Sequence, residues 1–259
     1  MLARAATIAT LVSYALALGL SDQCTRALSG IATSPDAAAC LSPSSLVSVF
    51  LGSSNTSVVD PINGWLTSLC SSPACSNDTL AAIVTNATTG CAMELSALGF
   101  NAAESGAKEQ ITVAVQTYYP TLRKVICLKD GDTNCVTQTL KNLESIIGPL
   151  SVDNVIQVVG KGFNFSAIPE NMTCTNCIKE AYNVIKQDFP MLDDPETTQA
   201  IQGQCSADFT DGKTPAGISQ SATTNTEVKQ DSGSVAFTSS SLMSASALVV
   251  ISGIFAALL

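Results

Sequence analysis

The stretch TCTNCIKEAYNVIKQDFP, Thr173 to Pro190, decides the fold class because its apolar residues recur at helical spacing. One stripe contains Cys174, Cys177, Ile178, Ala181, Tyr182, Ile185 and Phe189, as expected for a helix with one buried face. The Cys-x-x-Cys pair at its start has three interpretations: a redox centre, half of a metal site, or anchors for two disulfides.

The same periodicity recurs along the chain. Several segments open with a capping residue followed by proline, which favours a helix start; these pairs are Ser34-Pro35, Ser42-Pro43, Asp60-Pro61 and Asp194-Pro195. Helices are predicted over 42–50, 60–70, 76–85, 91–98, 108–118, 121–128 and 194–205, and from residues 133 and 151. No segment alternates with a period of two and no hairpin signal is found. We therefore predict an all-α, disulfide-stapled bundle of short helices, with Trp65 as a core anchor.

Both ends of the chain resemble processing signals. Residues 1–17 place Arg4 before an uncharged run ending in Ala15-Leu16-Ala17, the pattern of a cleaved signal peptide; a buried N-terminal helix is the alternative. Residues 233–259 combine a polar spacer with an apolar tail, which predicts a glycosylphosphatidylinositol (GPI) signal with Ser232 as the attachment residue. The alternative is a C-terminal membrane span.

These signals predict the organisation of the mature chain. Residues 18–205 would form one cysteine-rich ectodomain, and 206–232 a flexible, disordered Ser/Thr-rich stalk. The protein would be extracellular, held by a lipid anchor in the outer leaflet of the plasma membrane or transferred to the cell wall.

Cysteine and sequon content agree with this location. All ten cysteines lie within residues 18–205 and are expected to form five disulfides; they are Cys24, Cys40, Cys70, Cys75, Cys91, Cys127, Cys135, Cys174, Cys177 and Cys205. N-glycosylation is expected at the N-x-S/T sequons Asn55, Asn77, Asn86, Asn164 and Asn171.

Composition limits the chemistry. The chain has no histidine, which excludes Ser-His-Asp and Cys-His catalysis in their usual forms and histidine-ligated metals. Its net charge is −9, which argues against nucleic acid as a partner. Arg123, Lys124 and Lys129 are predicted to form a solvated helix face, and no cofactor is expected.

The Cys-x-x-Cys pair is best explained as two disulfide anchors. No strand-helix-strand pattern precedes Cys174, and a zinc site would need a second cysteine pair at matching spacing. Residues i and i+3 share a helix face, so each cysteine can reach a different segment. We expect Cys127–Cys135 and Cys70–Cys75 bridges, one of Cys174 or Cys177 bonded to Cys205, and the rest linking Cys24, Cys40 and Cys91.

Several motifs resemble an uncharacterised family of secreted, GPI-anchored, cysteine-rich proteins of mushroom-forming fungi. The resemblance covers residues 22–215 and is carried most specifically by YYPTLRKVICLKD (118–130) and CTNCIKEAY (174–182). It implies a surface location and provides no catalytic residues.

Three functions follow as expectations. The first is a non-enzymatic surface glycoprotein of the fungal cell envelope, structural or adhesive, with cell-wall polysaccharide as a partner. The second is a binding module for a lipid or another apolar ligand. The third is a hydrolase using two carboxylates, with Asp193-Asp194 or Asp130 and Asp132 as candidates. A pair of adjacent acids is more often a helix cap or a solvated pair than a catalytic dyad, so we expect no enzymatic activity.

Overall fold

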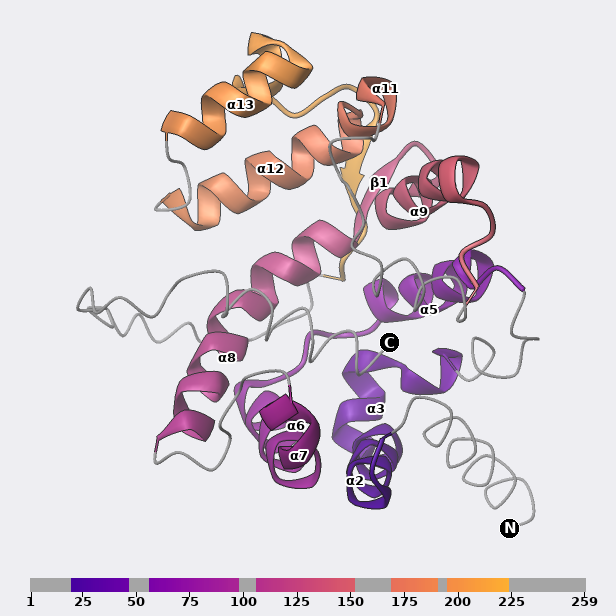
Figure 1. The fold of residues 1–259 in the computed structure, drawn as a ribbon, viewed down its shortest axis with the longest axis vertical. Helices are drawn as coiled ribbons and strands as arrows, with labels where there is room; N and C mark the ends of the chain where they lie inside the picture. The colour runs from indigo at the N-terminus through magenta and orange to yellow at the C-terminus, as the bar shows by residue number, and fades with distance from the viewer. Residues whose placement is uncertain (1–19, 47–55, 98–105, 152–168, 191–194, 224–259) are drawn as a thin grey trace. The chain divides into compact units, whose positions relative to one another are not determined.

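The computed structural model describes residues 20–46, 56–97, 106–151, 169–190 and 195–223. These residues are mostly helical and form two compact units (Figure 1). Unit 1 contains residues 20–46, 73–97 and 106–119, and unit 2 contains 56–72, 120–151, 169–190 and 195–223. The all-α prediction is confirmed, whereas the expected single ectodomain is divided into two units.

Unit 1 is built from helices whose starts follow local capping rules. Its elements are α2 (Asp22–Thr33), α3 (Pro35–Leu41), the 3-10 helix η1 (Pro43–Leu46), α6 (Asn77–Gly90), α7 (Ala92–Ala97) and the first part of α8 (Ala107–Ile126). The Ser76 hydroxyl accepts the N–H of Thr79 at 3.1 Å and so caps α6. Pro35 occupies the first turn of α3, where its missing N–H costs nothing.

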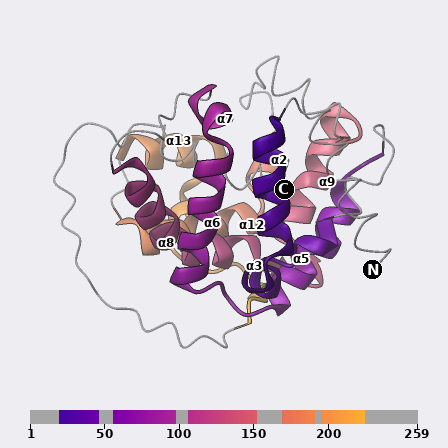
Figure 2. The same ribbon diagram turned by 90° about the horizontal axis from the view of Figure 1, so that it is seen from below.

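Helices α2 and α6 of unit 1 run side by side (Figure 2). Their approach is close because α6 ends in glycine: a Cβ on Gly90 would lie only 2.1 Å from the Cβ of Ala27. The Cys24–Cys91 disulfide joins the two helices beside this contact. Packing and covalent bond therefore fix the same pair of elements.

Unit 2 combines helices with a small sheet. Its elements are α5 (Val59–Ser71), the end of α8, β1 (Leu128–Asp130), β2 (Thr133–Asn134), α9 (Cys135–Ile147), α11 (Glu170–Thr173), α12 (Asn176–Asp188), α13 (Pro195–Cys205), the 3-10 helix η4 (Ala207–Thr210) and β3 (Ile218–Gln220). Trp65 of α5 is 6 % exposed, as expected of a core anchor. Asn134 caps α9 by accepting the N–H of Val136 at 2.8 Å.

The sheet corrects the expectation that the chain has no hairpin. Strands β1 and β2 pair antiparallel through Asp130 and Thr133, leaving the two-residue loop Gly131-Asp132. Gly131 has φ +57°, a conformation that a hairpin of this length requires and glycine adopts without strain. Because the strands contain only three and two residues, they are too short to show a period-two pattern.

The segment after Cys205 corrects the expected start of the stalk at residue 206. Strand β3 pairs antiparallel with β1 and completes a three-stranded sheet in the order β2-β1-β3. Phe209 is buried, and Thr223 donates its N–H to the carbonyl of Cys70 at 2.8 Å. Residues 206–223 are therefore part of unit 2, and residues 224–232 of the predicted stalk lie outside the described residues.

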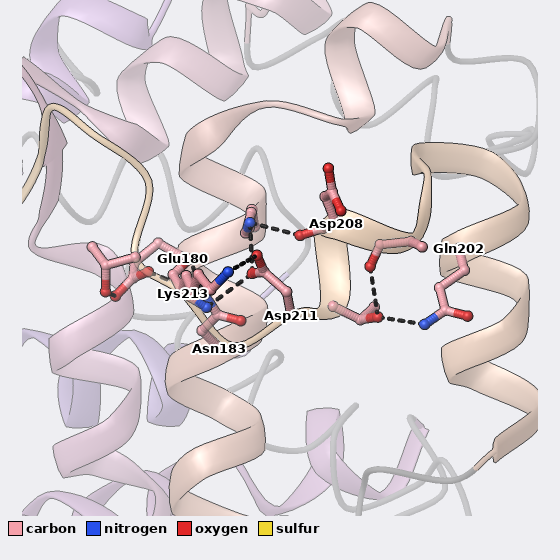
Figure 3. Close-up of polar contacts among 10 residues, drawn as sticks. Glu180, Asn183, Gln202, Asp208, Asp211 and Lys213 are labelled. Atoms are coloured by element: carbon pink, nitrogen blue, oxygen red, sulfur yellow. Dashed lines mark hydrogen bonds and ion pairs between the residues drawn. The ribbon is translucent and has the colours of Figure 1, made fainter.

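Polar contacts hold this C-terminal segment against α12 (Figure 3). The Lys179 ammonium lies 2.8 Å from an Asp211 carboxylate oxygen and donates to the carbonyl of Asp208 at 2.6 Å. Glu180 accepts the hydroxyl of Thr214 at 3.0 Å. The ammonium of Lys179 is the largest cause of the lowered pKa of Asp211, whose carboxyl also accepts the N–H of Lys213.

All ten cysteines are paired, as expected, but most pairings differ from the predicted ones. The disulfides are Cys24–Cys91, Cys40–Cys75, Cys70–Cys127, Cys135–Cys177 and Cys174–Cys205. The link between the Cys174/Cys177 pair and Cys205 is confirmed. Predicted bridges Cys70–Cys75 and Cys127–Cys135 are wrong because all four cysteines reach partners in other elements, 35 to 57 residues away.

The predicted solvated face around Arg123 is also wrong. The Arg123 side chain is buried and donates to the carbonyl of Leu69 at 3.0 Å and to that of Ser72. These carbonyls lie at the C-terminal end of α5, and that of Leu69 also accepts the N–H of Ser72 at 3.3 Å. Lys124 is half exposed and pairs with Asp188.

Other predictions have mixed outcomes. A kink or a break is expected at Pro120, between the helices predicted over 108–118 and 121–128; α8 has no break there and is continuous from Ala107 to Ile126 with Pro120 inside it. The predicted helices from 151 and over 47–50, like residues 1–19, lie outside the described residues. None of the described helices combines the length and apolar composition needed to cross a bilayer.

Candidate functional site

A groove with a polar rim lies on the surface of unit 1. It has a volume of about 330 Å³, at the lower end of the range of small-molecule sites. Helix α6 forms one wall, and the end of α2 with the start of α3 forms the other. We call this the α3–α6 groove; it is lined by Ile31, Ser34, Asp36, Ala37, Ser76, Asp78, Thr79, Ala82, Ile83 and Asn86.

The groove has an apolar floor and a polar rim. Ile31, Ala37 and Ile83 are at most 5 % exposed and belong to the core. Asp36 and Asp78 are exposed on the rim, each in the first turn of its helix. Acidic residues are favoured there by the helix dipole, so their presence has a local structural reason.

Two sequons lie on α6, the helix that forms one wall of this groove. Asn86 lines it and is exposed, while Asn77 is exposed at the first position of α6. Asn171 is exposed in α11 of unit 2. Asn55, Asn164 and the attachment residue Ser232 lie outside the described residues.

A second hollow, in unit 2, is apolar and smaller. Its volume is about 170 Å³, and it lies among α8, α9 and α12, with Val125, Leu140 and Ile178 in its lining. This volume is below the ~300–1,000 Å³ typical of small-molecule sites. This apolar hollow of unit 2 is therefore too small to enclose a lipid.

The two cysteines of the opening motif have separate partners. Cys174 is bonded to Cys205 at the end of α13, and Cys177 to Cys135 at the start of α9. Neither sulfur is a thiolate that could attack a disulfide or bind zinc in this oxidised state. The pair thus joins three helical segments of unit 2.

The carboxylates proposed as a dyad do not form a cleft in the described residues. Asp130 is the last residue of β1, and the exposed Asp132 lies in the two-residue loop of the β1–β2 hairpin. Asp193 and Asp194 lie outside the described residues.

Sequence reasoning missed a partly buried carboxylate in unit 1. Glu94 accepts the backbone N–H of Ser21 at 2.7 Å through Oε1, and its Oε2 is buried with no hydrogen-bond partner. Burial works to raise the pKa of Glu94, but the bond from Ser21 outweighs it and the pKa is lowered. The carboxylate lies near the sulfurs of Cys24 and Cys91, which are bonded to each other and offer no thiolate ligands.

Sequence reasoning also missed the α3–α6 groove, because its walls come from segments about 40 residues apart. The available signals were two serine-capped helix starts followed by Asp36 and Asp78, together with the sequon at Asn86. Comparison with protein-family models, with curated proteins and with solved structures found no match to this chain.

Proposed function

We propose that the chain is a non-enzymatic glycoprotein of a fungal cell surface with a structural or adhesive role. The observation that carries this proposal is the pairing of all ten cysteines into five disulfides, each within one unit. Stable disulfides of this number belong to oxidising compartments outside the cytosol.

The disulfides close long loops, which suits a protein that must persist without cellular repair. Their sequence separations run from 31 to 67 residues. In the chain-entropy account, each such loop stabilises the folded state by about 4 kcal/mol. Two small units with modest cores gain much of their stability in this way.

The site geometry favours a surface role over the two alternatives. The apolar hollow of unit 2 is about 170 Å³, which disfavours an enclosed lipid. Asp130 and Asp132 occupy a hairpin tip rather than a cleft that could hold a glycosidic bond between two carboxyl groups. The polar groove and the exposed sequons instead favour contact with carbohydrate.

Anchoring completes the proposal. Cleavage after Ala17 and lipid attachment at Ser232 would leave the two units joined to the outer leaflet, or to the cell wall, by a tether that starts after Thr223. Cell-wall polysaccharide is the partner that this location favours.

Treatment of intact cells of the source organism with phosphatidylinositol-specific phospholipase C tests the proposal. We expect release of a protein that runs faster on gels after N-glycan removal and whose mobility changes on reduction. Deleting the gene should weaken attachment of the cells to surfaces or the integrity of their wall.

Two results would contradict the proposal. One is a cytosolic, reduced and unglycosylated native protein. The other is hydrolysis of cell-wall glucan or chitin by the purified ectodomain, abolished by Asp130→Asn or Asp132→Asn, which would support the hydrolase instead. Retention on the membrane after phospholipase treatment, with the glycans present, would replace only the lipid anchor by a C-terminal span.

A further inference from the structure

We propose that the α3–α6 groove is the seat of the chain's own glycan, with the first N-acetylglucosamine linked to Asn86 lying in it. This inference rests on the proposed surface glycoprotein, because it requires passage through a compartment where N-glycans are added. The inference names a ligand for the α3–α6 groove, whereas the proposed function names none.

The position of the acceptor is the first argument. Asn86 is exposed and lines the groove, so a sugar bonded to its Nδ2 starts beside the hollow. The volume of about 330 Å³ is enough for a sugar residue. Tethering removes most of the entropy cost of binding, since a linked ligand has a high effective concentration at its site.

The chemistry of the lining is the second argument. A pyranose has apolar C–H faces and a rim of hydroxyl groups. The groove offers an apolar floor at Ile31, Ala37 and Ile83, and oxygen acceptors on its rim at Asp36 and Asp78. The floor suits a sugar face, and the rim carboxylates suit hydroxyl and acetamido N–H donors.

The fold also dictates when the sugar must be added. Thr88 completes the sequon but is 5 % exposed, and its hydroxyl donates to the carbonyl of Val84 at 2.7 Å. Asn86 and Thr88 are two residues apart on a helix and so point to different sides. An enzyme cannot reach both in folded α6, so modification precedes packing of this helix.

The transfer itself uses a lipid-pyrophosphate-linked oligosaccharide as donor. Nδ2 of Asn86 forms a bond to C1 of the first N-acetylglucosamine, and the C1–O bond to the pyrophosphate breaks. The lipid pyrophosphate leaves with the bonding electron pair, and one amide proton is released.

Hydrogen exchange on the secreted full ectodomain tests whether the glycan on Asn86 lies in the α3–α6 groove. Three forms are compared: the intact glycoprotein, the same protein trimmed by an endoglycosidase to one N-acetylglucosamine, and Asn86→Gln. Asn77→Gln is the matched control, because Asn77 is exposed on the same helix but does not line the groove.

We expect the amides of Ser34, Asp36 and Ala37 and of residues 78–83 to exchange about fivefold faster in Asn86→Gln than in the trimmed and intact forms. Asn77→Gln should match the intact protein. Peptide mass spectrometry should find glycan on Asn86 when the chain is secreted. Folded chain made without glycans and exposed later to oligosaccharyltransferase and donor should remain unmodified at Asn86.

Several results would overturn the inference. These are equal exchange in Asn86→Gln and the glycosylated forms, glycan on Asn77 and Asn171 but not on Asn86, and modification of Asn86 in the folded chain. Calcium that protects the groove amides equally in glycosylated and Asn86→Gln protein would also overturn it, by assigning the groove to a cation. All four leave the surface glycoprotein intact, whereas a chain with no glycan and reduced cysteines refutes the proposed function itself.

Discussion

Replacing Arg123 by methionine should destabilise unit 2 far more than replacing its neighbour Lys124. Arg123 is 5 % exposed and donates to the carbonyls of Leu69 and Ser72 at the end of α5. Methionine keeps much of the side-chain volume but removes both charged donors. The carbonyls at the helix end then lose partners that water cannot easily replace.

The magnitude follows from two opposing effects. Each hydrogen bond from a charged donor contributes about 1.5–3 kcal/mol, and the Leu69 carbonyl keeps only the weaker bond from the N–H of Ser72 at 3.3 Å. Removing the guanidinium also removes the cost of burying a charge, which offsets part of this loss. We expect a net loss of about 3 kcal/mol in the free energy of unfolding, equivalent to about 6–12 °C in Tm for a chain of this size.

Thermal and urea unfolding of the oxidised ectodomain, followed by circular dichroism, measures this difference. The control Lys124→Met removes a half-exposed ion pair with Asp188 and should cost about 1 kcal/mol or less. If Arg123→Met is no more destabilising than Lys124→Met, the reasoning that a buried arginine caps α5 is refuted.

Three further predictions concern unit 2. Burial works to raise the pKa of Asp188, but hydrogen bonds and charge from its neighbours lower this pKa below the ordinary 3.8. The contribution of Asp188 to the free energy of unfolding is therefore fully present above pH 3.8 and is lost as the pH falls through the lower folded pKa. Replacing both Cys70 and Cys127 by alanine should cost about 4 kcal/mol, since their bridge closes a separation of 57 residues. Ending the chain after Thr223 should preserve the fold, whereas ending it after Cys205 should increase protease cleavage, because β3 and its pairing with β1 are lost.

Each of these has a matched control. In Asp188→Asn, the free energy of unfolding should fall less steeply at acid pH than in the wild type. An unchanged pH dependence would refute the role of this carboxylate. Urea unfolding compares the double variant, Cys70→Ala with Cys127→Ala, with the reduced and the oxidised wild-type chain. Equal free energies of unfolding for the double variant and the oxidised wild type would contradict the estimate. Equal protease resistance of the two truncated chains would show that residues 206–223 do not support unit 2.

Local signals predicted the helices well. Ser76 and the Ser34-Pro35 pair mark true helix starts, because capping and proline effects act within one turn. The apolar stripe of 174–189 forms α12, whose Cys177 is buried in a cluster with Leu128 and Cys135. Helix starts and apolar helical stripes depend only on residues that are close in sequence, whereas the burial of Cys177 also needs Leu128 and Cys135.

Disulfide partners could not be predicted in the same way. Cys70 and Cys75 are close in sequence, and a rule based on sequence distance would pair them. Instead, Cys70 bonds to Cys127 and Cys75 bonds to Cys40. Pairing depends on which helices pack together, and that is set by contacts between distant segments. The sequence predicts a bond from either Cys174 or Cys177 to Cys205, and the structure assigns it to Cys174.

Burial also depends on tertiary structure. Arg123 was expected in solvent because charged side chains are usually exposed, and only the end of α5 supplies the acceptors that allow its burial. The polar composition after Cys205 predicted disorder, but β1 provides an edge for the short strand β3, and Phe209 is buried. The α3–α6 groove likewise exists only once α3 and α6 are brought together.

Peptide mapping of the native protein without reduction tests the central claim that the cysteines are structural bonds of an extracellular fold. We expect five linked peptide pairs, with Cys174 joined to Cys205 and Cys177 joined to Cys135. A Cys174–Cys177 bond, or free thiols at these two positions, would contradict it.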